Sequence, residues 1–88
     1  STQNTIKNQN SLILVYTSKQ EDKLSLLIAV SKNITQEYNA GSIIKKLSIF
    51  IGGSGGGQAD LAQAGTNDFT KLESIGKELI RILEHKDF

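Results

Sequence analysis

The glycine-rich stretch at residues 52–65 constrains this chain more than any other feature of its sequence. It reads GGSGGGQADLAQAG and holds six of the eight glycines of the chain. Glycine lacks a Cβ, so its backbone can adopt positive φ angles and approach a partner closely, but it loses more conformational entropy on folding than any other residue. A folded domain keeps such a stretch for a reason, which is either close packing of backbone against backbone or close approach of a ligand.

Length and composition indicate one small soluble domain. A chain of 88 residues can bury about 60% of its unfolded surface, which suffices for one modest core. The longest apolar runs, residues 12–16 and 26–30, are much shorter than the roughly 20 residues that span a bilayer. The chain has no cysteine, which excludes disulfides and thiolate metal sites and fits a cytoplasmic protein. Because it begins with Ser1, we expect a part of a longer protein.

The charge pattern gives little support to a polyanionic partner. The net charge is +1, with six lysines against three acidic residues in positions 1–58 and four basic against six acidic residues in positions 59–88. Such a mild asymmetry is typical of an ordinary solvated surface.

The first half of the sequence predicts a hairpin. Residues 1–10 are polar, apart from Ile6, and are interpreted as a frayed arm or a linker remnant, which leaves residues 11–88 as a single domain. Two β-branched and aromatic runs, at 11–17 and 24–30, predict antiparallel strands joined by a six-residue loop. Because both runs are continuous, we expect helices over one face of the sheet and partial cover over the other.

A first helix is predicted over residues 42–51, where apolar residues recur at helical spacing. Ser42 or Asn39 would be its N-cap, and Gly52 would end it. On the opposite, solvent-facing side of this helix the sequence places Lys45, Lys46 and Ser48.

A short strand at 59–64 and a final helix complete the prediction. The helix would begin at Asn67 or Thr70 and end near Lys86, with Thr70 and Glu73 forming a capping box. Its apolar stripe is formed by Phe69, Leu72, Ile75, Leu79, Ile82 and Leu83. The predicted fold class is α+β, a small mixed sheet with helices packed on it, in the order strand, strand, helix, glycine loop, strand, helix.

The position of the glycine loop excludes the two common nucleotide-binding loops. Dinucleotide-binding and P-loop glycines follow a strand and open a helix, whereas this stretch follows a predicted helix and has no lysine after Gly57. The negative end of the helix dipole would also repel phosphate there.

Two interpretations of the loop stay open. In one, the glycines only allow a tight helix-to-strand connection. In the other, successive main-chain N–H groups form a concavity that binds phosphate or sugar oxygens, and such donors recognise shape rather than base sequence. The candidate nucleic-acid-binding residues are Gly52, Gly53, Ser54, Gly55, Gly56, Gly57, Gln58, Gln63, Lys45 and Lys46.

The same stretch resembles the GGxGGGxxDxAQAG signature of the C-terminal domain of alanyl-tRNA synthetases, known as C-Ala, which is a DHHA1-type domain. The matching positions are Gly52, Gly53, Gly55, Gly56, Gly57, Asp60, Ala62, Gln63, Ala64 and Gly65. The resemblance implies a tRNA-binding domain that positions tRNA(Ala) for aminoacylation and editing by the other domains. It also implies a catalytic parent enzyme whose ATP and zinc sites lie outside this chain, and a chain that itself carries neither a catalytic residue nor a metal site.

Three positions depart from that family pattern. Ser54 stands where the family commonly has lysine, and Gln58 and Ala59 stand where it commonly has arginine and proline. Two positive charges are therefore missing, and we expect weak, weakly salt-dependent binding of tRNA. Gln58 also occupies the place of the substrate-binding histidine in related DHH-type phosphoesterases.

Several single residues have less specific interpretations. Asp60 and Gly65 are expected to shape the loop, with the Asp60 carboxylate accepting main-chain N–H bonds. His85 is expected to be exposed in the last helical turn. Tyr16 is expected in the core and Tyr38 as an anchor for its connection, with stacking on bases as the alternative for both.

Two alternatives to tRNA binding remain. One is dimerisation through the stripe of the last helix or an exposed strand edge. The other is a substrate-binding domain of a DHH-type phosphoesterase, which the missing histidine disfavours.

Overall fold

Five antiparallel strands form a single sheet in the part of the chain that the structure describes. This computed structural model describes residues 2–8 and 11–88, and side-chain detail begins at residue 12. The strands are β1 (Thr2–Asn8), β2 (Ser11–Gln20), β3 (Lys23–Val30), β4 (Ser54–Gly57) and β5 (Leu61–Thr66). Their order across the sheet is β1-β2-β3-β5-β4, so β1 and β4 are the two edges.

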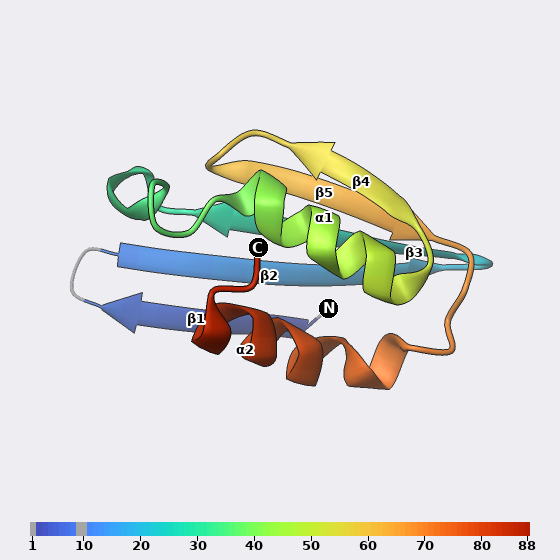
Figure 1. Cartoon of the computed structure of the whole chain (residues 1–88). Coiled ribbons are helices and arrows are strands. Elements are labelled where there is room, and N and C mark those ends of the chain that lie inside the picture. Colours follow the sequence, from blue (N-terminus) through green and yellow to red (C-terminus); the bar gives the residue numbers. More distant parts are fainter. Residues whose placement is uncertain (1, 9–10) are drawn as a thin grey trace.

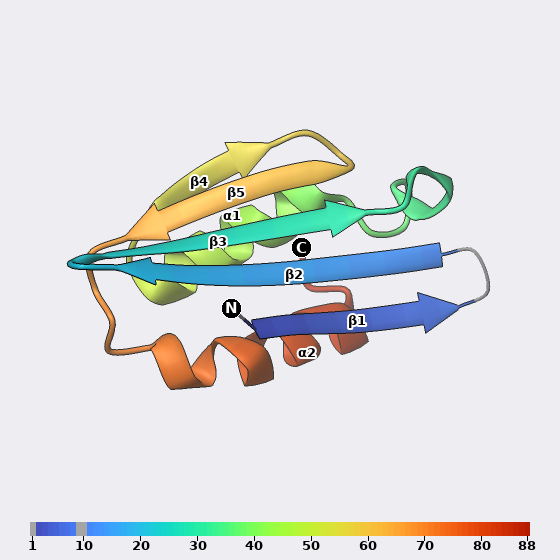
Figure 2. The ribbon, with the colours of Figure 1, turned by 180° about the vertical axis from the view of Figure 1, so that it is seen from behind.

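Two helices pack side by side on one face of this sheet, and neither lies on the other face (Figures 1 and 2). They are α1 (Ala40–Ile51) and α2 (Ile75–His85), and short 3₁₀ helices occupy Lys32–Ile34 and Leu72–Ser74. The α+β class is therefore confirmed. The expected partial cover of the second face is not present among the described residues, so one face of the sheet is open to solvent.

The predicted mixed sheet is wrong, because every described strand pair is antiparallel. A helix leading directly from β3 to β5 would have made these strands parallel. The glycine segment forms a strand of its own, and the turn after it reverses the chain, so β5 runs antiparallel to β3. The segment predicted as a loop is thus an edge strand.

The hairpin differs from its prediction at both ends. Thr2–Asn8 pair with Ser11–Thr17 of β2, in place of the frayed arm expected for residues 1–10, of which 1, 9 and 10 lie outside the described residues. The turn between β2 and β3 contains only Glu21 and Asp22, with Glu21 at φ 49°. Residues 18–20, expected in the loop, instead extend β2 to the turn, with side chains on alternate faces of the strand.

The core lies between the helices and the covered face of the sheet. In β3 and β5, buried residues alternate with more exposed ones, which is the repeat of two that a half-buried strand requires. Each large aliphatic side chain that is fully buried contributes roughly 1.5–3 kcal/mol. The largest of these are Leu24, Leu26, Ile28, Ile43, Ile44, Leu47, Ile51 and Ile82.

Helix α1 begins at Ala40, two residues before its predicted start, and ends as predicted. The Asn39 side chain accepts a hydrogen bond of 3.1 Å from the Ser42 amide, and Gly52 ends the helix in the left-handed region at φ 72°. Ser48, expected in solvent, is buried instead, and its hydroxyl is satisfied within the helix by donating to the Lys45 carbonyl at 2.8 Å.

Helix α2 starts later than predicted. Its N-cap is Ser74, so the expected capping box of Thr70 and Glu73 does not form. Thr70 instead donates its amide and hydroxyl to the Asp68 carboxylate, at 2.9 and 2.7 Å, which stabilises the turn before the 3₁₀ helix. The apolar stripe is confirmed, with Ile75, Leu79, Ile82 and Leu83 buried and Phe69 and Leu72 packed against the core.

Candidate functional site

Four of the glycines in the segment are explained by the fold itself. Gly52 needs its positive φ to end α1. A Cβ on Gly53 would lie 2.8 Å from the Thr66 Cβ, one on Gly55 would lie 2.7 Å from the Ala64 Cα, and one on Gly57 would lie 2.5 Å from the Ala62 Cα. Strand β4 can therefore pack here only without side chains at these positions, which supports the packing interpretation for half of the strand.

Gly56 and Gly65 have no such explanation. A Cβ on Gly56 would meet nothing within 4 Å, and one on Gly65 would come no closer than 3.4 Å to the Lys23 Cε. Both face the open side of the sheet, where Gly56 is paired with Gln63, and Gly65 with Ser54. Since nothing inside the domain requires these two glycines, the surface around them is the candidate binding site.

We call this surface the glycine face. It forms a shallow depression of about 380 Å³ over β3, β5 and β4. A second depression, of about 710 Å³, continues from it past Gly52 and Gly53 to Asp68. The side chains and bare backbone that make up the glycine face belong to Lys23, Ser25, Ser54, Gly56, Gln63 and Gly65.

The expected concavity of successive outward N–H groups does not form. The amides of Gly52 and Gly53 donate to carbonyls at the end of α1, at 3.3 and 2.8 Å, and the Gln58 amide donates to Leu61 at 2.8 Å. Hydrogen bonds in an antiparallel pair alternate, so Ser54 and Gly56 also direct their polar backbone groups to β5. Gly55 is left with its amide toward the free edge of the sheet.

The turn between β4 and β5 closes the N-terminus of α1. The amides of Ala40 and Gly41 donate to the carbonyls of Ala59 and Gln58, at 2.8 and 3.0 Å. Two of the four amides that a helix start leaves unpaired are therefore bound within the domain, and the Asn39 side chain binds a third.

The lysines proposed from the sequence do not adjoin the glycine face. Lys45 and Lys46 are exposed on α1, which lies against the opposite face of the sheet (Figure 1). Lys46 pairs with Asp87 at 3.4 Å, next to α2. The lysine at the glycine face is Lys23, which sequence reasoning missed because it assigned that residue to a solvent loop.

The two residues expected to shape the loop act differently from the prediction. Asp60 helps to fix the turn through its main-chain carbonyl, which accepts a hydrogen bond of 2.9 Å from Val30, and its carboxylate makes no hydrogen bond to any described residue. Gly65 lies within strand β5 and not in a loop. A Cβ at this position would lie 3.4 Å from the Lys23 Cε, so packing within the domain does not require glycine here.

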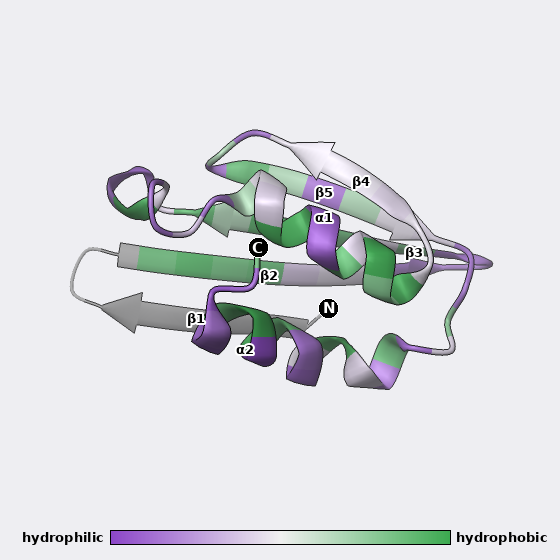
Figure 3. Ribbon diagram, in the orientation of Figure 1, coloured by the Kyte–Doolittle hydropathy of each residue, from purple (hydrophilic) through white to green (hydrophobic). Residues whose placement is uncertain are grey.

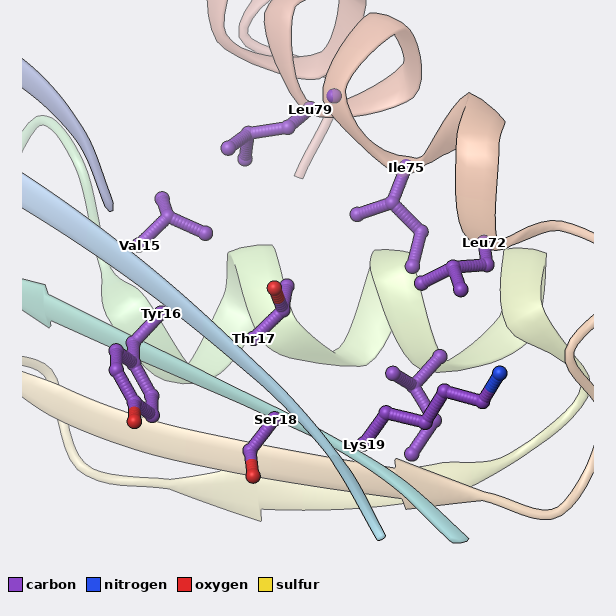
Figure 4. A pocket seen from close by; sticks show the side chains of 10 residues that line it. Val15, Tyr16, Thr17, Ser18, Lys19, Leu72, Ile75 and Leu79 are labelled. Atoms are coloured by element: carbon purple, nitrogen blue, oxygen red, sulfur yellow. The ribbon is translucent and has the colours of Figure 1, made fainter. Parts of the chain in front are cut away.

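The remaining single residues divide between confirmed and wrong predictions. Tyr38 anchors its connection, with its ring centre 5.9 Å from that of Phe88, and His85 is exposed in the last turn of α2. Tyr16, expected in the core, is 42% exposed on the open face. Tyr16 points away from α2, on the opposite side of β2 from Val15 and Thr17 (Figure 4).

Charged groups gather at the end of α2, remote from the glycine face. Arg81 donates to Glu78 at 2.7 Å and to Asp87 at 3.2 Å. The Arg81 hydrogen bond, with help from Lys46, holds the pKa of the Asp87 carboxyl below its usual value. The Glu37 carboxylate, 2.6 Å from the Lys86 Nζ, raises the pKa of that ammonium group.

Asp68 brings a negative charge to the end of the second depression. Its two hydrogen bonds from Thr70 lower the pKa of its carboxyl, so this group is ionised at neutral pH. Asp68 and Lys23 therefore line the depression with opposite charges. The site offers no strong positive field to a polyanion.

A groove of about 600 Å³ with a mixed polar and apolar lining separates β2 from α2 on the covered side of the sheet (Figure 4). Leu72, Ile75 and Leu79 line it from the helical side, and Val15 and Thr17 from β2. Its one cation, Lys19, lies over the Phe69 ring, 4.8 Å from the ring centre. No set of converging acid, base or nucleophile lines this groove, so its chemistry is that of packing.

The described residues contain no group of three or more histidine, aspartate or glutamate side chains placed to hold a metal ion. Neither described helix has the length and apolar character needed to cross a membrane.

Comparison with known proteins identifies the family. Residues 2–85 match the DHHA1 domain. Alanine–tRNA ligases of Rickettsia massiliae and Rickettsia felis are 55% and 54% identical over 82 residues, which is 92% of this chain and 9% of each relative. The crystal structure of the C-Ala domain from Aquifex aeolicus alanyl-tRNA synthetase superposes with a TM-score of 0.74 at 37% identity, covering 81% of this chain and 64% of that chain.

The chain thus spans about a tenth of the length of these curated relatives, and the similarity extends over almost all of its own length. The match includes residues 2–8, which form β1. The structural likeness is to a C-terminal domain. The chain belongs to the DHHA1 domain family, in the form similar to the C-Ala domain of alanyl-tRNA synthetases.

Proposed function

We propose that this chain is the tRNA-binding C-terminal domain of a cytoplasmic alanyl-tRNA synthetase. In this role it would hold tRNA(Ala) for aminoacylation and editing, and its partners would be tRNA and the rest of the parent enzyme. The names of the relatives support the parent activity, alanine–tRNA ligation. The ATP and zinc sites of such a parent would lie outside this chain.

The proposal depends on one observation. Gly56 and Gly65 leave the open face without side chains at these two positions, although packing inside the domain does not require glycine at either. A Cβ at either position would project toward solvent, so the fold would tolerate alanine there. Absence of side chains at a surface is useful to a domain whose partner must come close to the backbone. The neighbouring hydroxyl and amide groups of Ser54, Ser25 and Gln63 can then form hydrogen bonds with the RNA.

Polar contacts of this kind predict weak tRNA binding that depends on the shape of the RNA and not on its base sequence. The glycine face has a single lysine, and Ser54 and Gln58 replace the two basic residues of the family pattern. Each phosphate that a protein neutralises contributes about 0.7–0.9 to the salt slope of binding. We therefore expect the salt dependence of tRNA binding by this chain to have a slope near 1. In the parent enzyme, the domain would contribute mainly by holding tRNA near the other domains.

The test is a titration of unmodified tRNA(Ala) with Gly56→Val. Valine at this position should leave the melting temperature nearly unchanged, because an added Cβ would meet nothing within 4 Å. It should weaken tRNA binding by about tenfold or more. The matched control is Ile49→Val, on an α1 side chain that is 77% exposed on the helical side, which should leave binding unchanged.

Unchanged affinity of Gly56→Val for tRNA, with native stability, would refute the proposed interface. The dimer alternative predicts instead that light scattering reports twice the chain mass. Dimerisation through the last helix is disfavoured, because the stripe residues Ile75, Leu79 and Ile82 are buried in the domain's own core.

A further inference from the structure

We infer that the open face of the sheet binds unstacked nucleobases of RNA, with Tyr16 as the stacking residue, rather than a continuous phosphate backbone. This inference rests on the proposed function and adds the part of the RNA that is recognised. It extends the site from the glycine face across the sheet to β2.

A row of four residues crosses the open face. The strand register places Gly56 beside Gln63, Gln63 beside Leu27, and Leu27 beside Tyr16. Neighbouring strands are about 4.8 Å apart, so this row is roughly 15 Å long. That length accommodates two or three bases lying flat, and neither helix covers it (Figure 2).

The row is flat and mostly apolar. Gly56 has no side chain, Leu27 is half-buried, and the Tyr16 ring is 42% exposed. The Tyr16 hydroxyl has no partner among the described residues, so no hydrogen bond holds the ring to the domain. In Figure 3, β4 is almost white, since glycine and serine are neither strongly hydrophobic nor strongly hydrophilic.

The charge of this surface argues against backbone recognition. Among the described residues of β2 to β5 that face outward, Lys23 is the only charged one, and it lies at the hairpin end of the face. The charged side chain of Lys19, on the same hairpin, is directed to the helical side and lies over Phe69. A surface that followed a phosphate backbone would need a line of cations.

Nucleobases fit the same surface well. Aromatic residues on an open sheet stack with bases that are splayed out of loops or ends, and such stacking tolerates any base. The Gln63 amide, between Gly56 and Leu27, can donate to and accept from a base edge. Lys23 can meet the phosphate that follows the stacked base.

The experiment compares two ligands of equal charge and length, an eight-nucleotide oligouridine and its abasic counterpart. The chain carries two tyrosines and no tryptophan, so Tyr38→Phe leaves Tyr16 as the one tyrosine ring seen by NMR. Stacking should shift the Tyr16 ring signals on addition of oligouridine and leave them in place with the abasic strand. Equal shifts, or equal affinities, with both ligands would overturn the inference.

Substitutions then separate this inference from the proposed function. Tyr16→Ala should weaken tRNA binding by about fivefold to a hundredfold with an unchanged salt slope, and Tyr16→Phe should bind like the native chain. Lys23→Gln should lower the slope by about 0.7–0.9. Because Tyr16 is partly exposed, a thermal melt should confirm folding of each variant.

The outcomes are distinct. Native affinity in Tyr16→Ala together with weakened binding in Gly56→Val would refute base stacking and retain tRNA binding. Native affinity in both variants would refute both proposals. Conversion of a dimer to a monomer by Tyr16→Ala, without loss of RNA affinity, would assign the open face to a second copy of the chain and overturn the inference.

Discussion

The amide of Gly41 donates a hydrogen bond of 3.0 Å to the carbonyl of Gln58, and this bond fixes the start of α1 against the end of the glycine strand. The turn after β4 thus replaces solvent as the partner of the helix N-terminus. Because β4 and α1 are joined at this point, the position of the glycine face depends on the capping of the helix.

Asn39→Ala should destabilise the domain through the same helix end. It removes the side chain that accepts from the Ser42 amide, and an N-cap of this kind contributes about 1 kcal/mol. For a domain of this size the melting temperature should fall by about 4–8 °C. Asn39→Asp retains an accepting oxygen and should melt close to the native chain, whereas an equal loss in both variants would contradict a capping role.

Gly55→Val and Gly56→Val should differ sharply in stability. A Cβ at position 55 would meet the backbone of β5 at 2.7 Å, whereas one at position 56 would meet nothing within 4 Å. We expect Gly55→Val to lose about 3 kcal/mol or more, or to fail to fold, and Gly56→Val to change stability by less than about 0.5 kcal/mol. Urea denaturation of both variants measures the difference, and similar losses would show that β4 packs differently.

The stability of the domain should fall on acidification, in part through Asp87. Its carboxyl has a pKa below the model-compound value of 3.8, chiefly because Arg81 donates to it. A lowered pKa in the folded state stabilises the protein above the unfolded pKa, and this contribution is lost as the pH falls through the folded value. Thermal melts from neutral pH to about pH 2 should show a smaller acid-induced decrease in Asp87→Asn than in the native chain.

Ser54→Lys should strengthen binding to tRNA. Ser54 is exposed on the glycine face, and lysine there restores one of the two charges that the family pattern has and this chain lacks. One further phosphate contact should steepen the salt slope by about 0.7–0.9, measured from affinities at two salt concentrations. Lys45→Gln, on the helical side, is the control, and a larger effect of that variant would place the contact on α1 instead.

The sequence predicted the elements whose signals are local. The helical spacing of Ile43, Ile44 and Leu47, the Asn39 cap and the Gly52 stop lie within a few residues of one another, so α1 could be placed almost to the residue. The stripe of α2 was equally clear, but its start was not, because Asp68 binds Thr70 in a turn that competes with a capping box.

The glycine strand could not be predicted from its own residues. Four consecutive residues of composition SGGG have low strand propensity, and they adopt strand geometry because β5 and α1 leave a space that only bare backbone fills. Missing this strand led to the mixed sheet. It also concealed which glycines face inward, so Gly56 and Gly65 could not be separated from the others, and Lys23 could not be brought next to them.

Helix α1 runs back alongside β4, with its first turn at Gln58 and its last turn at Gly52. Its dipole is equivalent to about half a positive charge at the first end and half a negative charge at the second. The short glycine strand therefore lies in an electrostatic gradient, which the Asp68 carboxylate reinforces at the negative end. Because the amides at the first end are bound by the carbonyls of Ala59 and Gln58, the Asp68 carboxylate is the stronger of the two charges, and an anionic ligand on the strand would be repelled from the Gly52 end.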